Sequence, residues 1–152
     1  MSDLETNPSA LSLLDETRRA AAVAMGLCAR PDDAPLSNPK IAIISIPRDY
    51  TTLSGAAVPA SAYDVGMRMI SVEQVHRAMT VTGALCAAVA QKLRGTLVAQ
   101  IAAAGHQNIR IGSPSGVFDV DADIDPNRRH AHSASLYRTC RRLMQGAVSA
   151  PA

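Results

Sequence analysis

The sequence predicts an α+β fold in which an antiparallel sheet curls around one central apolar helix. Residues 82–93 are dominated by Ala and Leu and contain no acidic residue, which predicts a helix that is apolar nearly all round. Residues 109–111 and 118–124 alternate between apolar and polar side chains, which is typical of half-buried strands. A helix without a polar face must be covered on more than one side, and a sheet wrapped around it provides that cover. With 152 residues, 47% of them hydrophobic, the chain has the size and composition of one globular domain, residues 1–152.

The charge and composition exclude several classes of partner. The chain carries 15 basic and 13 acidic residues, and its net charge of +2 is too balanced to indicate a nucleic acid or an anionic membrane as partner. Aromatic residues make up 3% of the chain, so stacking surfaces for bases are missing as well. The N-terminus is polar and acidic, and no apolar run is long enough to span a bilayer. We therefore expect a soluble cytoplasmic protein that binds neither membrane nor nucleic acid.

The cysteines carry little chemical signal. Cys28, Cys86 and Cys140 are an odd, widely spaced set without a CxxC motif, which indicates reduced thiols and no disulfide framework. Cys86 lies within the apolar helix, where we expect it to pack as a small apolar side chain. No pattern around any of the three indicates a lowered pKa, so none is predicted to be a nucleophile.

The first half of the chain is predicted to begin with a helix and to continue into a strand. Residues 7–8, Asn-Pro, are typical of a helix start, and Gly26 of a helix end. Three prolines make residues 31–39 a loop, the β-branched run at 41–46 predicts a strand, and the small polar residues 51–61 predict another loop. The apolar face of the helix is expected to contain Leu11, Leu14, Ala21, Ala22 and Met25.

The second half contains the clearest hairpin. Residues 112–116, Gly-Ser-Pro-Ser-Gly, join the two alternating segments. Residues 64–75 fit neither the helical nor the strand period and remain ambiguous. Residues 126–133 predict a polar loop, and residues 134–150 predict a last element that is either a helix or a strand.

Two groups of potential metal ligands are better explained without a metal. One group has aspartates at spacing two, but it lacks the glycine and the final acid that a calcium loop needs, so a solvated strand face is the better interpretation. The other group is made of histidines in polar loops, with no acidic or cysteine ligand at matching spacing. We therefore predict no metal site. The two groups are Asp119, Asp121 and Asp123, and His106, His130 and His132.

The start of the apolar helix is a candidate anion site. The first backbone N–H groups of a helix have no partner within it, and the helix dipole adds positive charge there. No acidic residue occupies this turn, Gly83 removes a side chain that would hold a ligand away, and Thr80 and Thr82 offer hydroxyl groups. The alternative is an ordinary helix capped by threonine. Among the C-terminal arginines, Arg138 lies in a segment of small and apolar residues and is the candidate for pairing with a carboxylate.

Five segments in this order resemble the PrpF family. They are Glu16–Leu27, Pro39–Ala42 followed by Pro47 and Asp49-Tyr50, the pattern His76-x-Ala78-Met79 followed by Thr82-Gly83-Ala84, the Gly112–Gly116 loop, and Arg138–Gly146. Each motif alone is weak, but five in the same order over nearly the whole chain form a specific resemblance.

The resemblance implies the fold of diaminopimelate epimerase, in which two similar lobes, each a sheet around a central helix, enclose a cleft. It implies an isomerase that moves a double bond by proton transfer next to a carboxylate, on unsaturated di- or tricarboxylates such as 2-methylaconitate, without a metal or organic cofactor. This chain corresponds to the C-terminal lobe and to no segment of the N-terminal lobe. The implied substrate-binding residues are Met79, Thr80, Thr82, Gly83, Ala84, Ser115, Gly116 and Arg138.

Departures from the family pattern limit the expected chemistry. The family's catalytic cysteine and lysine belong to the first lobe, so no catalytic residue is assigned here. Thr80 stands where the related epimerases have a cysteine, and Ser113 stands where the loop usually has a histidine. We therefore expect half a site that is inactive alone, paired with a first lobe or with a second copy of itself. The alternatives are a non-catalytic binding or interaction module that retains the fold, and the epimerase class, which Thr80 disfavours.

Overall fold

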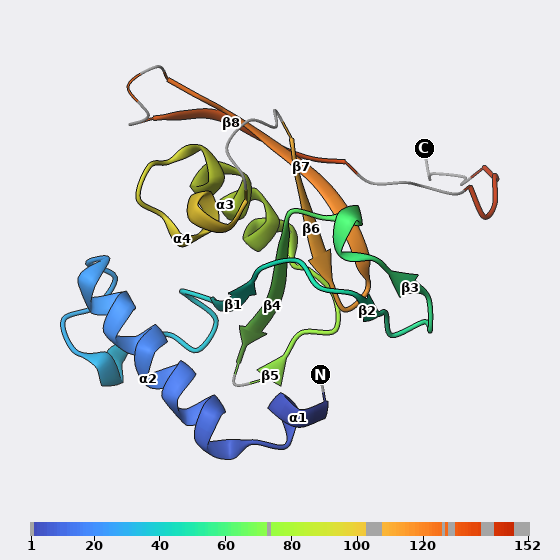
Figure 1. The fold of residues 1–152 in the computed structure, drawn as a ribbon. Coiled ribbons are helices and arrows are strands. Elements are labelled where there is room, and N and C mark those ends of the chain that lie inside the picture. Colours follow the sequence, from blue (N-terminus) through green and yellow to red (C-terminus); the bar gives the residue numbers. More distant parts are fainter. Residues whose placement is uncertain are drawn as a thin grey trace.

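The computed structural model describes residues 2–72, 74–102, 108–125, 127, 130–137 and 142–147 (Figure 1). One six-stranded sheet dominates it, and the end of its strand β4 also pairs with the short strand β5 (Gln74–Val75). The path through the sheet is β1 (Ile41–Ser45), β4 (Val65–Ser71), β6 (Ile109–Ser113), β7 (Gly116–Ile124) and β8 (Ala131–Tyr137).

The sheet is mixed and not purely antiparallel as predicted. The pairs β1–β4, β4–β5, β6–β7 and β7–β8 are antiparallel, whereas β4 and β6 are parallel. A parallel pair needs a crossover connection. Here the crossover contains helix α3 (Val81–Lys92) and the short helix α4 (Leu97–Ile101). The crossover places α3 against the sheet, as the predicted architecture requires (Figure 1).

The core lies between α3 and the concave face of the sheet. Because successive strand residues point to opposite faces, each strand contributes every second side chain to this core. Alanines on α3 allow a close approach between helix and sheet. The core includes Val65, Met67 and Met69 of β4, Ala84, Ala87 and Ala88 of α3, Val98 of α4, Ile109 and Ile111 of β6, and Val120 and Ala122 of β7.

Helix α3 is buried on one side only, which corrects the prediction of a fully enclosed helix. Val81, Thr82 and Cys86 are exposed, so Cys86 is not the packed side chain that we expected. The reason is the alanine content of the helix. Alanine is apolar but small, so an alanine-rich sequence looks apolar all round whether or not every side is covered.

Helix α2 (Pro8–Ala24) packs beside the sheet, next to the edge strand β1, after the short helix α1 (Ser2–Glu5) (Figure 1). Its start is as predicted, because the Asn7 side chain accepts a hydrogen bond from the Ala10 N–H at 3.1 Å. Ala22 is buried, but Met25 is 62% exposed and does not belong to the packed face. The loop that follows contains one short 3-10 turn, Pro31–Asp33, before β1 begins at the predicted residue.

Residues 51–61 are not simply a loop. They contain most of a small hairpin, β2 (Tyr50–Thr51) and β3 (Ala57–Val58), followed by a 3-10 turn at Ala60–Ala62. Strands of two residues are too short to show a period in the sequence, which is why the prediction missed them. We call residues 49–63 the arm.

The last described strand also differs from the prediction. Strand β8 begins at Ala131, within the segment expected to be a loop, and resolves the choice between helix and strand for residues up to Tyr137. The hairpin of β6 and β7 is as predicted, with Val120 opposite Ile109 and Phe118 opposite Ile111. Within the described part of the chain, no helix is long and apolar enough to cross a bilayer.

Candidate functional site

The two predicted halves of the site lie at the same end of the sheet. In the parallel β4–β6 pair, Gly66 is opposite Gly112. Three residues further along the chain from this pair lie Met69 on β4 and Ser115 in the turn after β6. Met69 is in turn the residue against which the start of α3 packs, because a Cβ at Gly83 would lie 2.9 Å from Met69 Cε. The register thus places the N-terminus of α3 level with the 112–116 turn.

Thr80 caps helix α3. Its backbone is extended, and its side-chain oxygen accepts a hydrogen bond from the Gly83 N–H at 3.3 Å. The Ala84 N–H is bonded to the Thr80 carbonyl at 2.9 Å. The hydroxyl of Thr80 is therefore used as the cap that we gave as the alternative. By helix geometry, the N–H groups of Val81 and Thr82 remain without a partner inside the helix.

Gly83 has a structural reason that the sequence did not reveal. A Cβ at this position would lie 2.7 Å from Thr80 Oγ1 and 2.9 Å from Met69 Cε. The glycine thus lets the helix pack against its own cap and against β4, and access for a ligand is not needed to explain it. Met79 and Ala84 are buried, whereas Val81 and Thr82 are exposed, and Thr82 is the polar side chain of this turn that a ligand can reach.

The second predicted element is the turn between β6 and β7. Ser113 is fully buried, and its hydroxyl lies 3.2 Å from the Ser115 hydroxyl and donates to the Gly116 carbonyl at 3.2 Å. The Ser115 N–H donates back to Ser113 Oγ at 3.3 Å. Gly116 has φ +127°, a conformation that side chains rarely adopt, which explains the glycine. The turn is thus a rigid, internally bonded loop.

The arm braces this turn from outside. The Leu53 N–H donates to the Pro114 carbonyl at 2.8 Å, and the Tyr50 hydroxyl donates to the Gly116 carbonyl at 3.3 Å. Tyr63 packs edge-on against Tyr50, with ring centroids 5.5 Å apart. The arm therefore fixes the position of the turn.

Arg68 is a polar residue of this region that the sequence reasoning missed. It lies on β4 between two core methionines, and its Nη1 donates to the Met67 carbonyl at 3.0 Å and to the Gly112 carbonyl at 3.4 Å. Its guanidinium carbon lies 5.4 Å from the centroid of the Tyr50 ring. A signal was present, because Arg68 is the one charged residue in the run Val65–Ile70.

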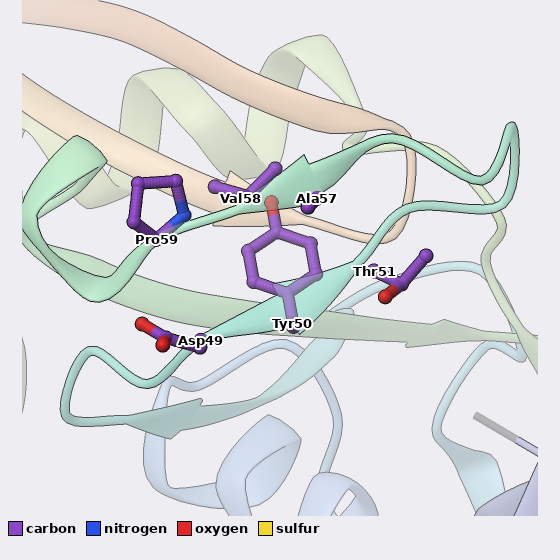
Figure 2. A pocket seen from close by; sticks show the side chains of 6 residues that line it. All are labelled: Asp49, Tyr50, Thr51, Ala57, Val58 and Pro59. Carbon is purple, nitrogen blue, oxygen red and sulfur yellow. The ribbon is translucent and has the colours of Figure 1, made fainter.

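Tyr50 is the titratable group whose pKa responds most clearly to this region. Burial raises the pKa of its hydroxyl above the ordinary value of 10.0, and the nearby positive charge of Arg68 opposes that shift without cancelling it. A hollow of about 320 Å³ lies on the same arm, lined by Asp49, Tyr50, Thr51, Ala57, Val58 and Pro59 (Figure 2). The carboxylate in it is already engaged, since Asp49 Oδ1 accepts from the Ala60 N–H at 2.7 Å.

The remaining predicted residues lie elsewhere or outside the described part of the chain. Arg138, Cys140 and His106 are among the residues that the structure does not describe. The rings of His130 and His132 lie 5.4 Å apart on the loop and strand at the opposite end of β7 from Gly116. Among the described residues, no group of three or more His, Cys, Asp or Glu side chains is placed to hold a metal ion.

Comparison with known proteins gives this architecture a family. The family described as PrpF protein matches residues 1–151. This chain belongs to the PrpF family. Among its PrpF relatives, the 2-methyl-aconitate isomerase of Shewanella oneidensis is 32% identical over 98% of this chain, and that of Cupriavidus necator 31% over 97%. The 3-methylitaconate isomerase of Eubacterium barkeri is 29% identical over 93%.

A solved structure shows the same fold. The crystal structure of methylitaconate-delta-isomerase matches 95% of this PrpF chain with a TM-score of 0.83 and 27% identity, which confirms the predicted lobe fold. The match covers 38% of that solved chain. Likewise, this chain spans 36–39% of the length of the curated relatives that it matches. Its fold is thus that of an isomerase, and the relatives that it matches here are longer.

Proposed function

We propose that this chain is the C-terminal, carboxylate-binding lobe of a PrpF isomerase that acts on unsaturated di- or tricarboxylates such as 2-methylaconitate. The observation that carries the proposal is the family match over residues 1–151 combined with a fold match that covers little more than a third of methylitaconate-delta-isomerase. Relatives in this family are named for isomerising 2-methylaconitate and 3-methylitaconate.

The proposed chemistry needs little from this lobe except binding. Moving a double bond in such a substrate removes a proton from a carbon next to the alkene and returns a proton at the far end of the resulting allylic anion. A neighbouring carboxylate must be held in place while charge develops. The first turn of α3 contains no acidic residue, and the N–H groups of Val81 and Thr82 can receive an anion there. We assign no acid or base to this chain and no cofactor to the reaction.

The proposed partner is a first lobe that covers the end of the sheet where the candidate site lies. Without that lobe, we propose that a second copy of this chain covers the same end. Four exposed apolar side chains surround this end: Leu53 of the arm, Val72 after β4, Val81 at the start of α3, and Val117 after the turn. An apolar surface of this kind is typical of an interface. The chain alone should therefore bind a hydrophobic dye or dimerise, as seen by light scattering. A monodisperse monomer without dye binding would contradict this part of the proposal.

The activity test compares the chain alone with the chain plus its missing counterpart. The counterpart is the part of a 2-methyl-aconitate isomerase outside the matched 39%. In heavy water, we expect no deuterium exchange into 2-methylaconitate with the chain alone and measurable exchange with the mixture. Loss of an acid–base group typically costs ~10²–10⁴-fold, so the contrast is large. Exchange by the chain alone that a Cys or His substitution abolishes would overturn the half-site, whereas citrate binding without exchange in the mixture favours a binding module.

The binding test uses citrate and the amide resonances of the chain. Citrate should perturb Val81, Thr82 and Gly83 most, with weak, millimolar affinity. Thr82→Asp should abolish the perturbation, because it places a negative charge in the first turn at an exposed position. Gly83→Asp is a poor variant, since its Cβ would clash with Thr80 and Met69. The matched control is Thr51→Asp, an exposed threonine on the arm, which should leave citrate binding unchanged. Shifts confined to Arg142 and its neighbours would mean contact with surface charge only.

A further inference from the structure

Strand β8 is one edge of the sheet, and nothing in its sequence protects that edge. Among the described residues its only neighbouring strand is β7, so the backbone N–H and C=O groups on its outer side have no strand partner there (Figure 1). Edge strands usually carry charged residues or proline, which prevent pairing with another chain. The residues of β8, Ala-His-Ser-Ala-Ser-Leu-Tyr, include no lysine, arginine, acidic residue or proline. The outer side of β8 is therefore open to pairing with another strand.

The opposite edge of the sheet, strand β1, is protected. Helices α2 and α4 both contact β1. Lys40 directly precedes the strand, and Arg48 follows shortly after its end. The described part of the chain thus covers one edge and leaves the other uncovered, which indicates that the β8 edge is meant to receive a strand.

The core beside β8 is incompletely covered. Ala134 and Leu136 of β8 pack against the core but are only half-buried. Val89 and Ala90 of α3, the helix that β8 contacts, are half-buried as well. On the other face of the strand, Tyr137 is 55% exposed. A further strand beside β8 would remove apolar surface from water on both faces, which is favourable.

The regular part of β8 is complementary to itself. The β7–β8 register shifts between Asp123 and Ile124, so regular pairing covers Ser133–Tyr137, with the sequence Ser-Ala-Ser-Leu-Tyr. A two-fold axis at Ser135 would place two copies antiparallel, with Ser135 opposite its own counterpart, Ala134 opposite Leu136, and Ser133 opposite Tyr137. Small side chains then meet large ones, two hydroxyl groups meet at the axis, and no like charges are opposed. This pattern suits a second copy of the same chain.

We propose that β8 pairs antiparallel with β8 of a second copy of this chain, with the two-fold axis at Ser135, so that the two sheets continue through the contact. The inference goes beyond the proposed function, because the candidate site lies at the β4–β6 pair and β8 is the far edge of the sheet. Cover of the site by a first lobe and pairing of two β8 edges are different contacts. The paired segment is short compared with a standard interface of about 1,600 Å², so the dimer should dissociate on dilution.

Disulfide crosslinking at the axis tests both the contact and its register. In a chain whose native cysteines are replaced by serine, Ser135→Cys should form a covalent dimer under a mild oxidant. Directly opposite residues have Cβ atoms about 4.5–5.5 Å apart, and a small shift brings them within disulfide range. The matched control is Ser133→Cys, an exposed serine on the same face of the strand. It should crosslink far more slowly, because its counterpart would lie about 13 Å away along the strand direction.

A charge at the axis tests the contact without oxidation. Ser135→Lys places two like charges opposite each other, so light scattering over a dilution series should show severalfold weaker dimerisation. Because Ser135 is exposed, the urea midpoint should stay unchanged. The control is Thr51→Lys, an exposed threonine on the arm, which adds the same charge away from β8 and should dimerise like the wild type.

Two results would overturn the inference and leave the proposed function standing. One is Ser135→Cys crosslinking no faster than Ser133→Cys, together with Ser135→Lys associating like the wild type. The other is protection of Ser135→Cys from crosslinking by an added first lobe, which would assign the β8 edge to that lobe instead of to a second copy.

Discussion

The two faces of strand β4 serve different purposes although both are buried. Val65, Met67 and Met69 point toward α3 and belong to the core. On the opposite face, Gly66 and Arg68 lie against the arm, where Tyr63 packs over the glycine and the Tyr50 ring packs against the guanidinium. The first face is apolar and adaptable, since methionine fills irregular gaps. The second is polar and tightly fitted.

The difference shows how one strand connects stability to the candidate site. The core face fixes where β4 lies relative to α3, and the arm face fixes where the 112–116 turn lies relative to β4. A change on the core face should lower the free energy of unfolding and affect ligand binding only through it. A change on the arm face should displace the turn at a smaller cost in stability.

The largest effect is expected on the core face. Met67→Ala should lower the free energy of unfolding by about 2–5 kcal/mol, because it removes a buried side chain and leaves a cavity. Urea denaturation measures this change. The control is Leu13→Ala on α2, a side chain that is 64% exposed, which should change stability by about 0.5 kcal/mol or less. Equal effects of the two variants would show that the β4–α3 contact is not the core of this domain.

A smaller effect is expected where the arm meets the sheet. A Cβ at Gly112 would lie 2.6 Å from Tyr63 Cδ2, and that ring is held because its hydroxyl accepts from the Arg48 N–H at 2.7 Å and donates to the Arg48 carbonyl at 2.6 Å. Gly112→Ala should therefore cost about 1–3 kcal/mol.

A second substitution tests whether the contact with Tyr63 causes this loss of stability. Adding Tyr63→Leu should recover part of the loss, which a double-mutant cycle measures. Gly146→Ala is the control, since a Cβ there meets nothing within 4 Å. Additive effects of the Gly112 and Tyr63 changes would rule out the close contact between arm and sheet.

The smallest expected effect is on the pH dependence of stability, through Tyr50 on the arm side of β4. Burial raises the pKa of Tyr50 above 10.0, so folding favours its protonated form. The contribution is fully present below the pKa of the unfolded chain and is lost as pH rises through the higher pKa of the folded state. The difference between the tyrosinate absorbance titrations of the wild type and of Tyr50→Phe should isolate a step with a midpoint above pH 10, and the variant should show a weaker alkaline loss of stability. A difference step centred at the ordinary value of 10.0 would place Tyr50 in solvent, away from Arg68.

The sequence predicted those elements whose two sides face different surroundings. The β6–β7 hairpin alternates because one of its faces is buried and the other is solvated, and the α2 start carries its own capping residue. Residues 64–75 gave no period because β4 is buried on both sides. The same double burial hid Arg68, whose bonding to Gly112 is visible only once β4 and β6 are paired.

Gly83 shows what the sequence could not predict about the candidate site. Its position at a helix start was consistent with ligand access, but the contacts that explain it come from Met69 on another element. Sequence located the turn of the helix correctly and could not tell which of its residues face inward. Val81 and Thr82 are the exposed residues of that turn, and this depends on how α3 is rotated against the sheet.

The parallel pairing of β4 with β6 has a consequence for how the chain folds. Strands β6, β7 and β8 follow one another closely and can form from local contacts. The β4–β6 pair joins residues separated by the whole crossover, so its loop-closure entropy must be met before the pairing is gained. We expect the β6–β8 meander to form early and the joint to β4 to close late. The candidate site straddles that joint, so it would be among the last parts of the molecule to take shape.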